Sequence, residues 1–108
     1  MSSSEAVAKQ RRYRLKFLPA ALEEWHALDG SVKTVLKKLL AKRLEQPHVP
    51  GAELHRDLRN CYKIKLLKQG YRLVYRVEDE VLVLLVLAVA KRADGSAYRA
   101  AKIGRAHV

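Results

Sequence analysis

The chain of 108 residues is long enough for one hydrophobic core and too short for two domains. Its 22 lysines and arginines against 11 aspartates and glutamates give a net charge of +11, which favours an anionic partner: nucleic acid, an acidic protein or an anionic membrane. A single cysteine excludes an intramolecular disulfide, and the longest apolar run, residues 81–90, is far shorter than the roughly 18 residues of a membrane-spanning helix.

The N-terminal residues 1–10 are small and mostly polar, with three consecutive serines, and we expect a disordered tail there ahead of a single domain at 11–108. They contain no apolar segment of the kind that a signal peptide needs, so we expect a cytoplasmic protein. Residues 11–17 then alternate, with Tyr13 and Leu15 on one side and Arg12 and Arg14 on the other. This alternation predicts a first strand with one basic side.

The first of two predicted helices follows directly. Pro19 suits the first turn of a helix, and the pair Asp29-Gly30 ends it. Apolar residues at helical spacing predict one buried face, formed by Leu18, Leu22, Trp25 and Leu28.

A longer second helix is predicted between a cap at Ser31 and a stop at Pro47. Its apolar stripe consists of Val32, Val35, Leu36, Leu39, Leu40 and Leu44. Its solvent face carries Lys33, Lys37, Lys38 and Lys42. Because the link between the two helices is so short, they should form an antiparallel αα-hairpin.

A β-hairpin is predicted after an irregular loop at residues 48–60. Residues 61–76 alternate with period two around a turn at 68–70, where Gly70 can adopt a positive φ. An even number of loop residues keeps the charges on one face, and it is expected to place Lys63 opposite Arg76 and Lys65 opposite Val74.

The predicted hairpin has one basic and one apolar face. The basic face carries Lys63, Lys65, Arg72 and Arg76, and the apolar face carries Tyr62, Ile64, Leu66, Leu73 and Tyr75. Like charges on neighbouring strands repel one another, so such a face suits a polyanion. Lysines and arginines also protect edge strands from aggregation, and the hairpin alone leaves both interpretations open.

Residues 81–90 are apolar at every position, which is typical of a central strand covered on both faces, although a buried helix has the same pattern. Residues 96–105 are alanine-rich and basic and predict a short C-terminal helix. The element order is therefore β-α-α-β-β-β plus a short helix. We expect an α+β domain, with a mostly antiparallel four-stranded sheet and the αα-hairpin packed on its apolar face.

The sequence carries no motif for a metal, a cofactor or a protein nucleophile. The four histidines and the cysteine lack a metal-ligand spacing, and the glycines are too isolated for a phosphate loop. Acidic pairs fall on a helix surface and in a turn, where solvation explains them. The basic residues remain as the candidate site.

Three segments resemble the RelE toxins of bacterial toxin–antitoxin systems. They are residues 22–47, LEEWHALDGSVKTVLKKLLAKRLEQP, residues 61–92, CYKIKLLKQGYRLVYRVEDEVLVLLVLAVAKR, and Tyr98, which follows Arg92 by six residues. The similarity covers about residues 12–104, with the same element order. It implies a RelE-like fold and an endoribonuclease that enters the ribosomal A site and cuts mRNA. The implied reaction is attack of a ribose 2′-hydroxyl on the adjacent phosphate, with no metal or cofactor.

The resemblance also implies the catalytic residues, each of the expected type: Lys63, Lys65, Arg72, Arg92 and Tyr98. Because arginine keeps its proton, Arg72 and Arg92 suit a clamp on phosphate oxygens, and either lysine is a candidate for proton transfer. Tyr98 suits stacking on a base. Contacts to RNA and the ribosome are expected from Arg12, Arg14, Lys33, Lys37, Lys38, Lys42, Arg76 and Lys91.

The partner that the resemblance implies is an acidic RelB-like antitoxin, which wraps the chain as an extended segment, whereas the free toxin is a monomer. No membrane partner is expected. Two other functions stay open from the sequence: a ParE-like poison of DNA gyrase, which has no need of the catalytic set, and a non-catalytic nucleic-acid-binding module. Cys61 is not expected to act, since an internal 2′-hydroxyl makes a protein nucleophile unnecessary.

Overall fold

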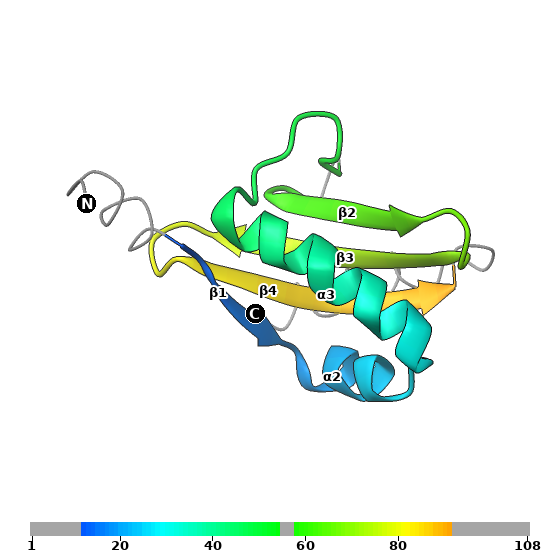
Figure 1. Ribbon diagram of the computed structural model, residues 1–108. Coiled ribbons are helices and arrows are strands. Elements are labelled where there is room, and N and C mark those ends of the chain that lie inside the picture. Colours follow the sequence, from blue (N-terminus) through cyan, green and yellow to red (C-terminus); the bar gives the residue numbers. More distant parts are fainter. Residues whose placement is uncertain (1–11, 55–57, 92–108) are drawn as a thin grey trace, which may run out of the picture.

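One four-stranded sheet forms the centre of the described residues, 12–54 and 58–91, of this computed structural model (Figure 1). The elements are β1 (Arg14–Phe17), α2 (Pro19–His26), α3 (Gly30–Glu45), β2 (Cys61–Leu66), β3 (Tyr71–Glu78) and β4 (Val83–Lys91). The strand order is β1-β4-β3-β2, with β1 parallel to β4 and the other neighbours antiparallel. The predicted α+β fold with a mostly antiparallel sheet is confirmed. The tail at 1–10 and the predicted C-terminal helix lie outside the described residues.

The first strand is shorter than its alternating pattern predicts. β1 begins only at Arg14, because the backbone N–H of Tyr13 donates to the carbonyl of Leu44 at the end of α3 (2.8 Å) and not to β4. From Arg14 onward the strand pairs with β4 and ends with Phe17 beside Val86. Pairing with β4 therefore begins at Arg14, one residue after the backbone hydrogen bond to α3.

Helix α2 packs against β4 and β1 through the buried Ala21 and Trp25. The prediction for Leu22 was wrong, since this side chain is 39% exposed. The small Ala21 takes the place against the sheet and turns Leu22 outward. Glu24 also covers β4 beyond the end of β1, where its carboxylate accepts a hydrogen bond from the backbone N–H of Val89 (2.9 Å).

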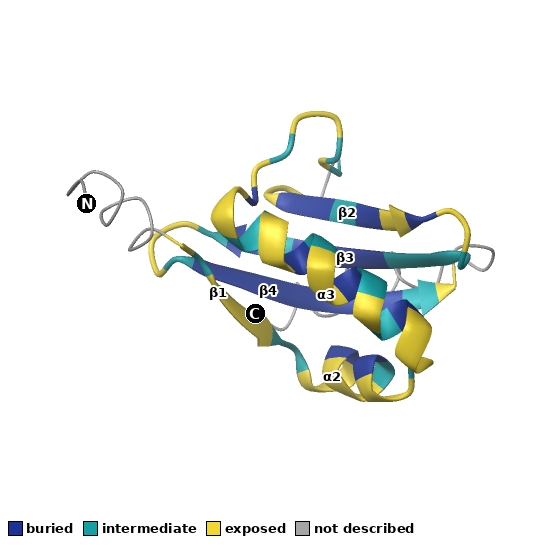
Figure 2. Cartoon of the chain, in the orientation of Figure 1, coloured by how far each residue is buried: buried dark blue, intermediate teal, exposed yellow. Residues whose placement is uncertain are grey.

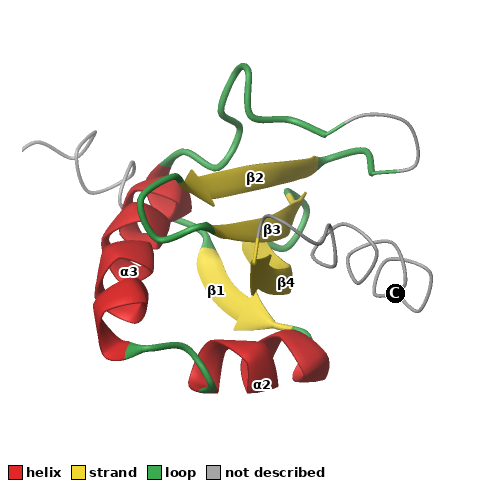
Figure 3. Cartoon of the chain, turned by 90° about the vertical axis from the view of Figure 1, so that its right-hand side faces the viewer, coloured by secondary structure: helices red, strands yellow, loops and turns green. Residues whose placement is uncertain are grey.

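Helix α3 lies across one face of the sheet (Figures 1 and 3). Its N-cap is Asp29 and not the predicted Ser31, because the Asp29 carboxylate accepts from both the backbone N–H and the hydroxyl of Ser31. The inner side of the helix carries the buried Val32, Leu36 and Leu40, as the predicted stripe requires. Figure 2 shows this buried side turned toward the strands.

Both faces of the sheet are covered. The helices pack on one face over alternate strand residues that include Tyr62, Ile64, Leu73 and Tyr75. A second cluster joins Leu58, Cys61, Val74, Val83, Leu85, Leu87 and Ala88. Because β4 lies between β1 and β3 and both its faces are covered, residues 83–89 are all buried, which confirms the predicted central strand. Its predicted start was two residues early: Val81 is 54% exposed and Leu82 has a φ of 53°, and both belong to the turn.

The hairpin register differs from the prediction by two residues. Lys65 lies opposite Arg72 and Lys63 opposite Val74, where Arg76 was expected opposite Lys63. The reason is that the four-residue loop begins at Leu67, one residue before the predicted turn, and is closed by the N–H of Gly70, which donates to the carbonyl of Leu66 (2.8 Å). An even shift leaves every side chain on its predicted face.

Candidate active site

A row of basic residues crosses one end of the sheet. Lys65 on β2 lies opposite Arg72 on β3, and Arg72 lies opposite Ala90 on β4, which precedes Lys91. Lys63 is two residues further into β2, opposite Val74. This is the end of the sheet where β2 and β4 finish and β3 begins. It lies on the right in Figure 1 and faces the viewer in Figure 3.

Lys63, Lys65 and Arg72 share the sheet face that is turned away from α3. Strand residues alternate between faces. Cys61 therefore shares a face with Lys63 and Lys65 on β2, and Val74 shares a face with Arg72 on β3. Both Cys61 and Val74 belong to the second core cluster, on the face away from α3. The strand pairing therefore places these three cations on one face of the sheet. Lys65 is exposed, and Lys63 and Arg72 are half-buried.

Two facing cations in this row suit a bound phosphate. Lys65 and Arg72 lie directly opposite each other on neighbouring strands, so an anion bound there would meet two positive charges. The guanidinium offers several fixed donors to phosphate oxygens, and a lysine ammonium adds a mobile one. The half-buried stems of Lys63 and Arg72 restrict where these charges can go.

The other predicted basic residues lie apart from this row. Arg76 is near the opposite end of β3 and forms an ion pair with Glu78 (2.5 Å). On α3, across the sheet, Lys33 is half-buried and Lys37, Lys38 and Lys42 are exposed, and so are Arg12 and Arg14 near β1. Lys91 is exposed at the end of β4. Arg92 and Tyr98 lie outside the described residues.

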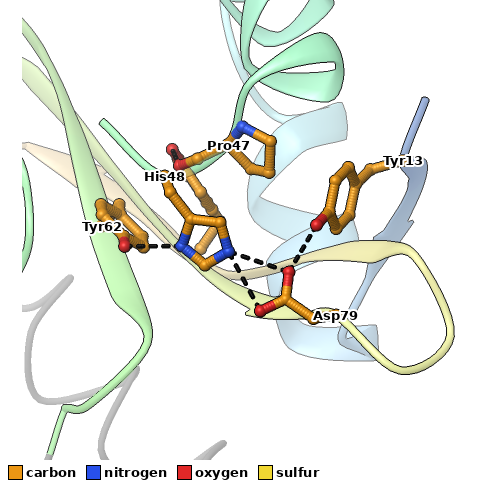
Figure 4. A network of polar contacts seen from close by, with 6 residues as sticks. Tyr13, Pro47, His48, Tyr62 and Asp79 are labelled. Atoms are coloured by element: carbon orange, nitrogen blue, oxygen red, sulfur yellow. Dashed lines mark hydrogen bonds and ion pairs between the residues drawn. The ribbon is translucent and has the colours of Figure 1, made fainter. Parts of the chain in front are cut away.

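A polar network that no sequence pattern indicated lies at the other end of the sheet (Figure 4). His48 binds the hydroxyl of Tyr62 through Nδ1 (2.7 Å) and the carboxylate of Asp79 through Nε2 (2.8 Å). The hydroxyl of Tyr13 donates to the same carboxylate. These contacts join the start of β1, the loop after α3, strand β2 and the turn after β3. Because the partners are 14 to 66 residues apart in sequence, no local spacing indicates the network.

The network changes the acidity of two of its members. The hydrogen bonds that Tyr13 and His48 make to Asp79 lower the pKa of that carboxyl, with the Tyr13 bond the larger cause. In return, the bond to Asp79 raises the pKa of Tyr13 to about 12. Neutral Tyr13 and charged Asp79 thus stabilise each other, which is a structural role.

Other kinds of site find no support in the described ranges. No group of three or more histidine, cysteine, aspartate or glutamate side chains is placed to hold a metal ion in residues 12–54 and 58–91. Within the same ranges, no helix is long and apolar enough to cross a membrane. A groove of about 230 Å³ lies between β1 and α3 and is lined by apolar side chains, including Leu15, Phe17 and Leu40, and by Lys37.

Comparison with known sequences shows that the chain is similar to bacterial toxins. The chain matches the model of a family described as the ParE toxin of the type II toxin–antitoxin system parDE over residues 15–95. It is 45% identical to the mRNA interferase toxin RelE of Escherichia coli K12 over 86 residues, which are 80% of this chain and 90% of that protein. The mRNA interferase RelE of Shigella flexneri matches with the same identity and coverage.

Comparison with solved structures agrees with the sequence matches. A mutant of the E. coli toxin RelE in the free state has a TM-score of 0.78 and 42% identity, covering 87% of this chain and 97% of that one. A chain of the intact E. coli RelBE toxin–antitoxin complex has a TM-score of 0.70 and 47% identity, over 73% and 95%. Sequence and fold thus match over most of the chain.

Proposed function

The chain belongs to the RelE family of bacterial type II toxins, and we propose that it is an endoribonuclease that cuts mRNA in the ribosomal A site. The observation that carries the proposal is the placement of Lys63, Lys65 and Arg72 on one face at one end of the sheet. Each is the residue type that the family resemblance implies at that position. The identity to two proteins named mRNA interferases supports the same activity.

The proposed reaction is a transesterification within the RNA. A base removes the proton of a ribose 2′-hydroxyl, the oxygen attacks the adjacent phosphorus, and the 5′-oxygen leaves with a proton from an acid. This gives a cyclic phosphate and a free 5′-hydroxyl, so no metal or protein nucleophile is required. Arg72, with Arg92, would bind the charge that develops on the phosphate oxygens. Lys63 and Lys65 are the candidates for proton transfer, and Tyr98 for stacking on a base.

We further propose an acidic antitoxin as the partner and the cytoplasm as the location. The net charge of +11 supports an acidic partner, and solved relatives include toxin–antitoxin complexes. The apolar groove between β1 and α3 offers such a partner a place outside the basic face, since Leu15 there is 37% exposed. A purified complex in which the toxin gains no stability and loses no activity would contradict this part.

The experiment that tests the activity compares Arg72→Ala with the parent chain. We expect the cleavage rate at saturating programmed ribosomes to fall by about 100-fold or more, because a donor that stabilises the transition state is lost. Binding should weaken much less. Lys68→Ala is the matched control, because it removes an exposed charge from the neighbouring turn and should leave the rate unchanged. Equal rates for Arg72→Ala and the parent would refute the assigned site.

A second candidate function follows from the description of the matched family. A ParE-like chain would poison DNA gyrase, and it would have no need of the three grouped cations. Purified parent chain added to gyrase and supercoiled DNA distinguishes the two functions. Accumulation of cleaved DNA by the parent, with Arg72→Ala equally toxic in cells, would favour the gyrase poison over the ribonuclease.

A further inference from the structure

Arg43 makes contacts that set it apart from the neighbouring lysines of α3. It lies in the last turn of α3 and is half-buried, whereas Lys37, Lys38 and Lys42 are exposed. Its Nη1 donates to the hydroxyl of Tyr75 (2.8 Å) and to the backbone carbonyl of Lys63 (3.3 Å). One side chain of the helix thus reaches the backbone of a candidate catalytic residue.

Tyr75 holds the guanidinium of Arg43 in place. The ring of Tyr75 is fully buried, its hydroxyl donates to the carbonyl of Pro47 (2.7 Å), and the guanidinium carbon of Arg43 lies 5.7 Å from the ring centroid. The ring also stacks on Tyr62 of the adjacent strand, with centroids 5.7 Å apart. These contacts leave Arg43 little freedom, so its bond to Lys63 has a fixed geometry.

The bond matters because β2 is an edge strand. In the part of the chain that the structure describes, only β3 pairs with it along its length, and its outer side is held by short contacts at Cys61 and Lys63. The N–H of Lys63 donates to the carbonyl of Ala52 (3.0 Å), and its carbonyl accepts from Arg43. The backbone of Lys63 is therefore fixed on both polar groups, while its side chain lies on the opposite face of the sheet.

We propose that Arg43 is a positioning residue for RNA cleavage: it fixes the backbone of Lys63 on β2 from behind the sheet and thereby holds the Lys63 side chain in place on the face that carries Lys65 and Arg72. This inference rests on the proposed function. A misplacement of about 1 Å can cost on the order of 100-fold in rate, so a small shift of an edge strand is enough to matter. Arg43 touches neither RNA nor the reacting atoms in this assignment.

The test replaces Arg43 by methionine, which keeps a long unbranched side chain and loses the donor. We expect the cleavage rate of Arg43→Met at saturating programmed ribosomes to fall by about 10-fold or more, with half-saturation changed much less. Arg43→Lys keeps a donor that can reach both oxygens and should recover most of the rate. Glu45→Gln, an exposed change in the same turn, is the control and should cleave like the parent.

A double-mutant cycle separates positioning from a general loss of structure. If Arg43 acts through Lys63, then Arg43→Met should slow Lys63→Ala by no more than about 2-fold, because the two changes remove one function. Backbone amides of residues 61–66 should exchange hydrogen faster in Arg43→Met. The inference would be overturned if the rate losses of the two substitutions multiplied in the double variant. It would also be overturned if a folded Arg43→Met cleaved as fast as the parent. If Arg43→Met does not fold, Arg43→Gln, whose amide is too short to span both partners, replaces it in the same cycle.

The two proposals fail in different ways. A parent chain that leaves ribosome-bound mRNA intact refutes the proposed function, whatever Arg43 does to the strand. The positioning role alone is refuted if the parent cleaves, Lys63→Ala cleaves slowly and Arg43→Met cleaves as fast as the parent.

Discussion

Asp79 is the residue on which the polar network at the turn end of the sheet depends. Its pKa is lowered from 3.8 by the hydrogen bonds from Tyr13 and His48, so folding favours its charged form. The resulting stability is fully present above the unfolded pKa and is lost as the pH falls through the lower folded pKa. We therefore expect Asp79→Asn to be less stable than the parent at pH 7, and the difference to shrink below about pH 4. Urea unfolding at several pH values measures it.

The same substitution should act on Tyr13. Because Asp79 raises the pKa of Tyr13 to about 12, Asp79→Asn should return it toward 10, as phenolate absorbance with a Tyr13→Phe reference would show. Glu80→Gln is the control, since Glu80 is exposed in the same turn. The carboxylate of Asp79 is more than half exposed, so solvent screening keeps the effect on stability small. If the free energy of unfolding of Asp79→Asn fell with decreasing pH as steeply as that of the parent, the stabilising role of the Asp79 carboxylate would be contradicted.

Cys61 lies next to the basic face, yet we expect Cys61→Ser to cleave within a few-fold of the parent. The thiol is fully buried with Val74 and Leu85, and the proposed attack by a 2′-hydroxyl needs no protein nucleophile. Stability is a separate matter, because a buried hydroxyl costs more free energy to remove from water than the thiol that it replaces. Cleavage and urea unfolding of Cys61→Ser and Cys61→Ala distinguish the two effects. A collapse of cleavage in both variants with stability retained would make Cys61 part of the site.

Among the elements, α3 presents its charges on the side of the molecule away from the candidate active site. The charge reversals Lys37→Glu and Lys38→Glu should therefore weaken ribosome binding more than the chemical step, and they should reduce the salt dependence of binding. Binding of ribosomes at several salt concentrations and single-turnover cleavage measure the two effects. The control is Lys16→Glu, an exposed reversal on β1. A slower chemical step with unchanged binding would reject this role for α3.

Periodicity predicted the faces of the elements better than their ends. The period of two on β2 and β3 is a property of the strand backbone, so Lys63, Lys65 and Arg72 could be assigned to one face from sequence. The register could not be predicted in this way, because loops of two and four residues place the side chains on the same faces. The apolar Leu67 looked like a strand residue, although it lies in the loop and is 72% exposed. Asp29 and Ser31 are both good N-caps, and only backbone geometry distinguishes them.

Long-range polar contacts escaped the sequence analysis for a different reason. Arg43 lies 20 residues from Lys63 and 32 from Tyr75, and His48 lies 31 from Asp79. These residues show no unusual local pattern: Arg43 looks like one more cation on a basic helix, and His48 follows a helix-ending proline. Such contacts depend on how α3 crosses the sheet, which local propensity does not determine.

At the scale of the whole molecule, the sheet separates two basic surfaces. One carries Lys63, Lys65 and Arg72, and the other lies on α3. Because the sheet lies between them, the two surfaces would bind different anionic segments. A ribosome that holds mRNA presents both kinds of segment, whereas free RNA presents a single flexible strand.

The last prediction concerns this difference between substrates. The candidate site gains no help from His48, which lies at the other end of the sheet, so efficient cleavage must depend on charge stabilisation and on the geometry of the substrate. A flexible strand seldom places its 2′-hydroxyl in line with the scissile bond, and the ribosome could impose that alignment. We expect free RNA to be cut orders of magnitude more slowly than the same sequence in a programmed A site, in a single-turnover comparison of the two. Arg72→Ala should slow both reactions, which shows that they share one site, and equal parent rates on the two substrates would make the enzyme ribosome-independent.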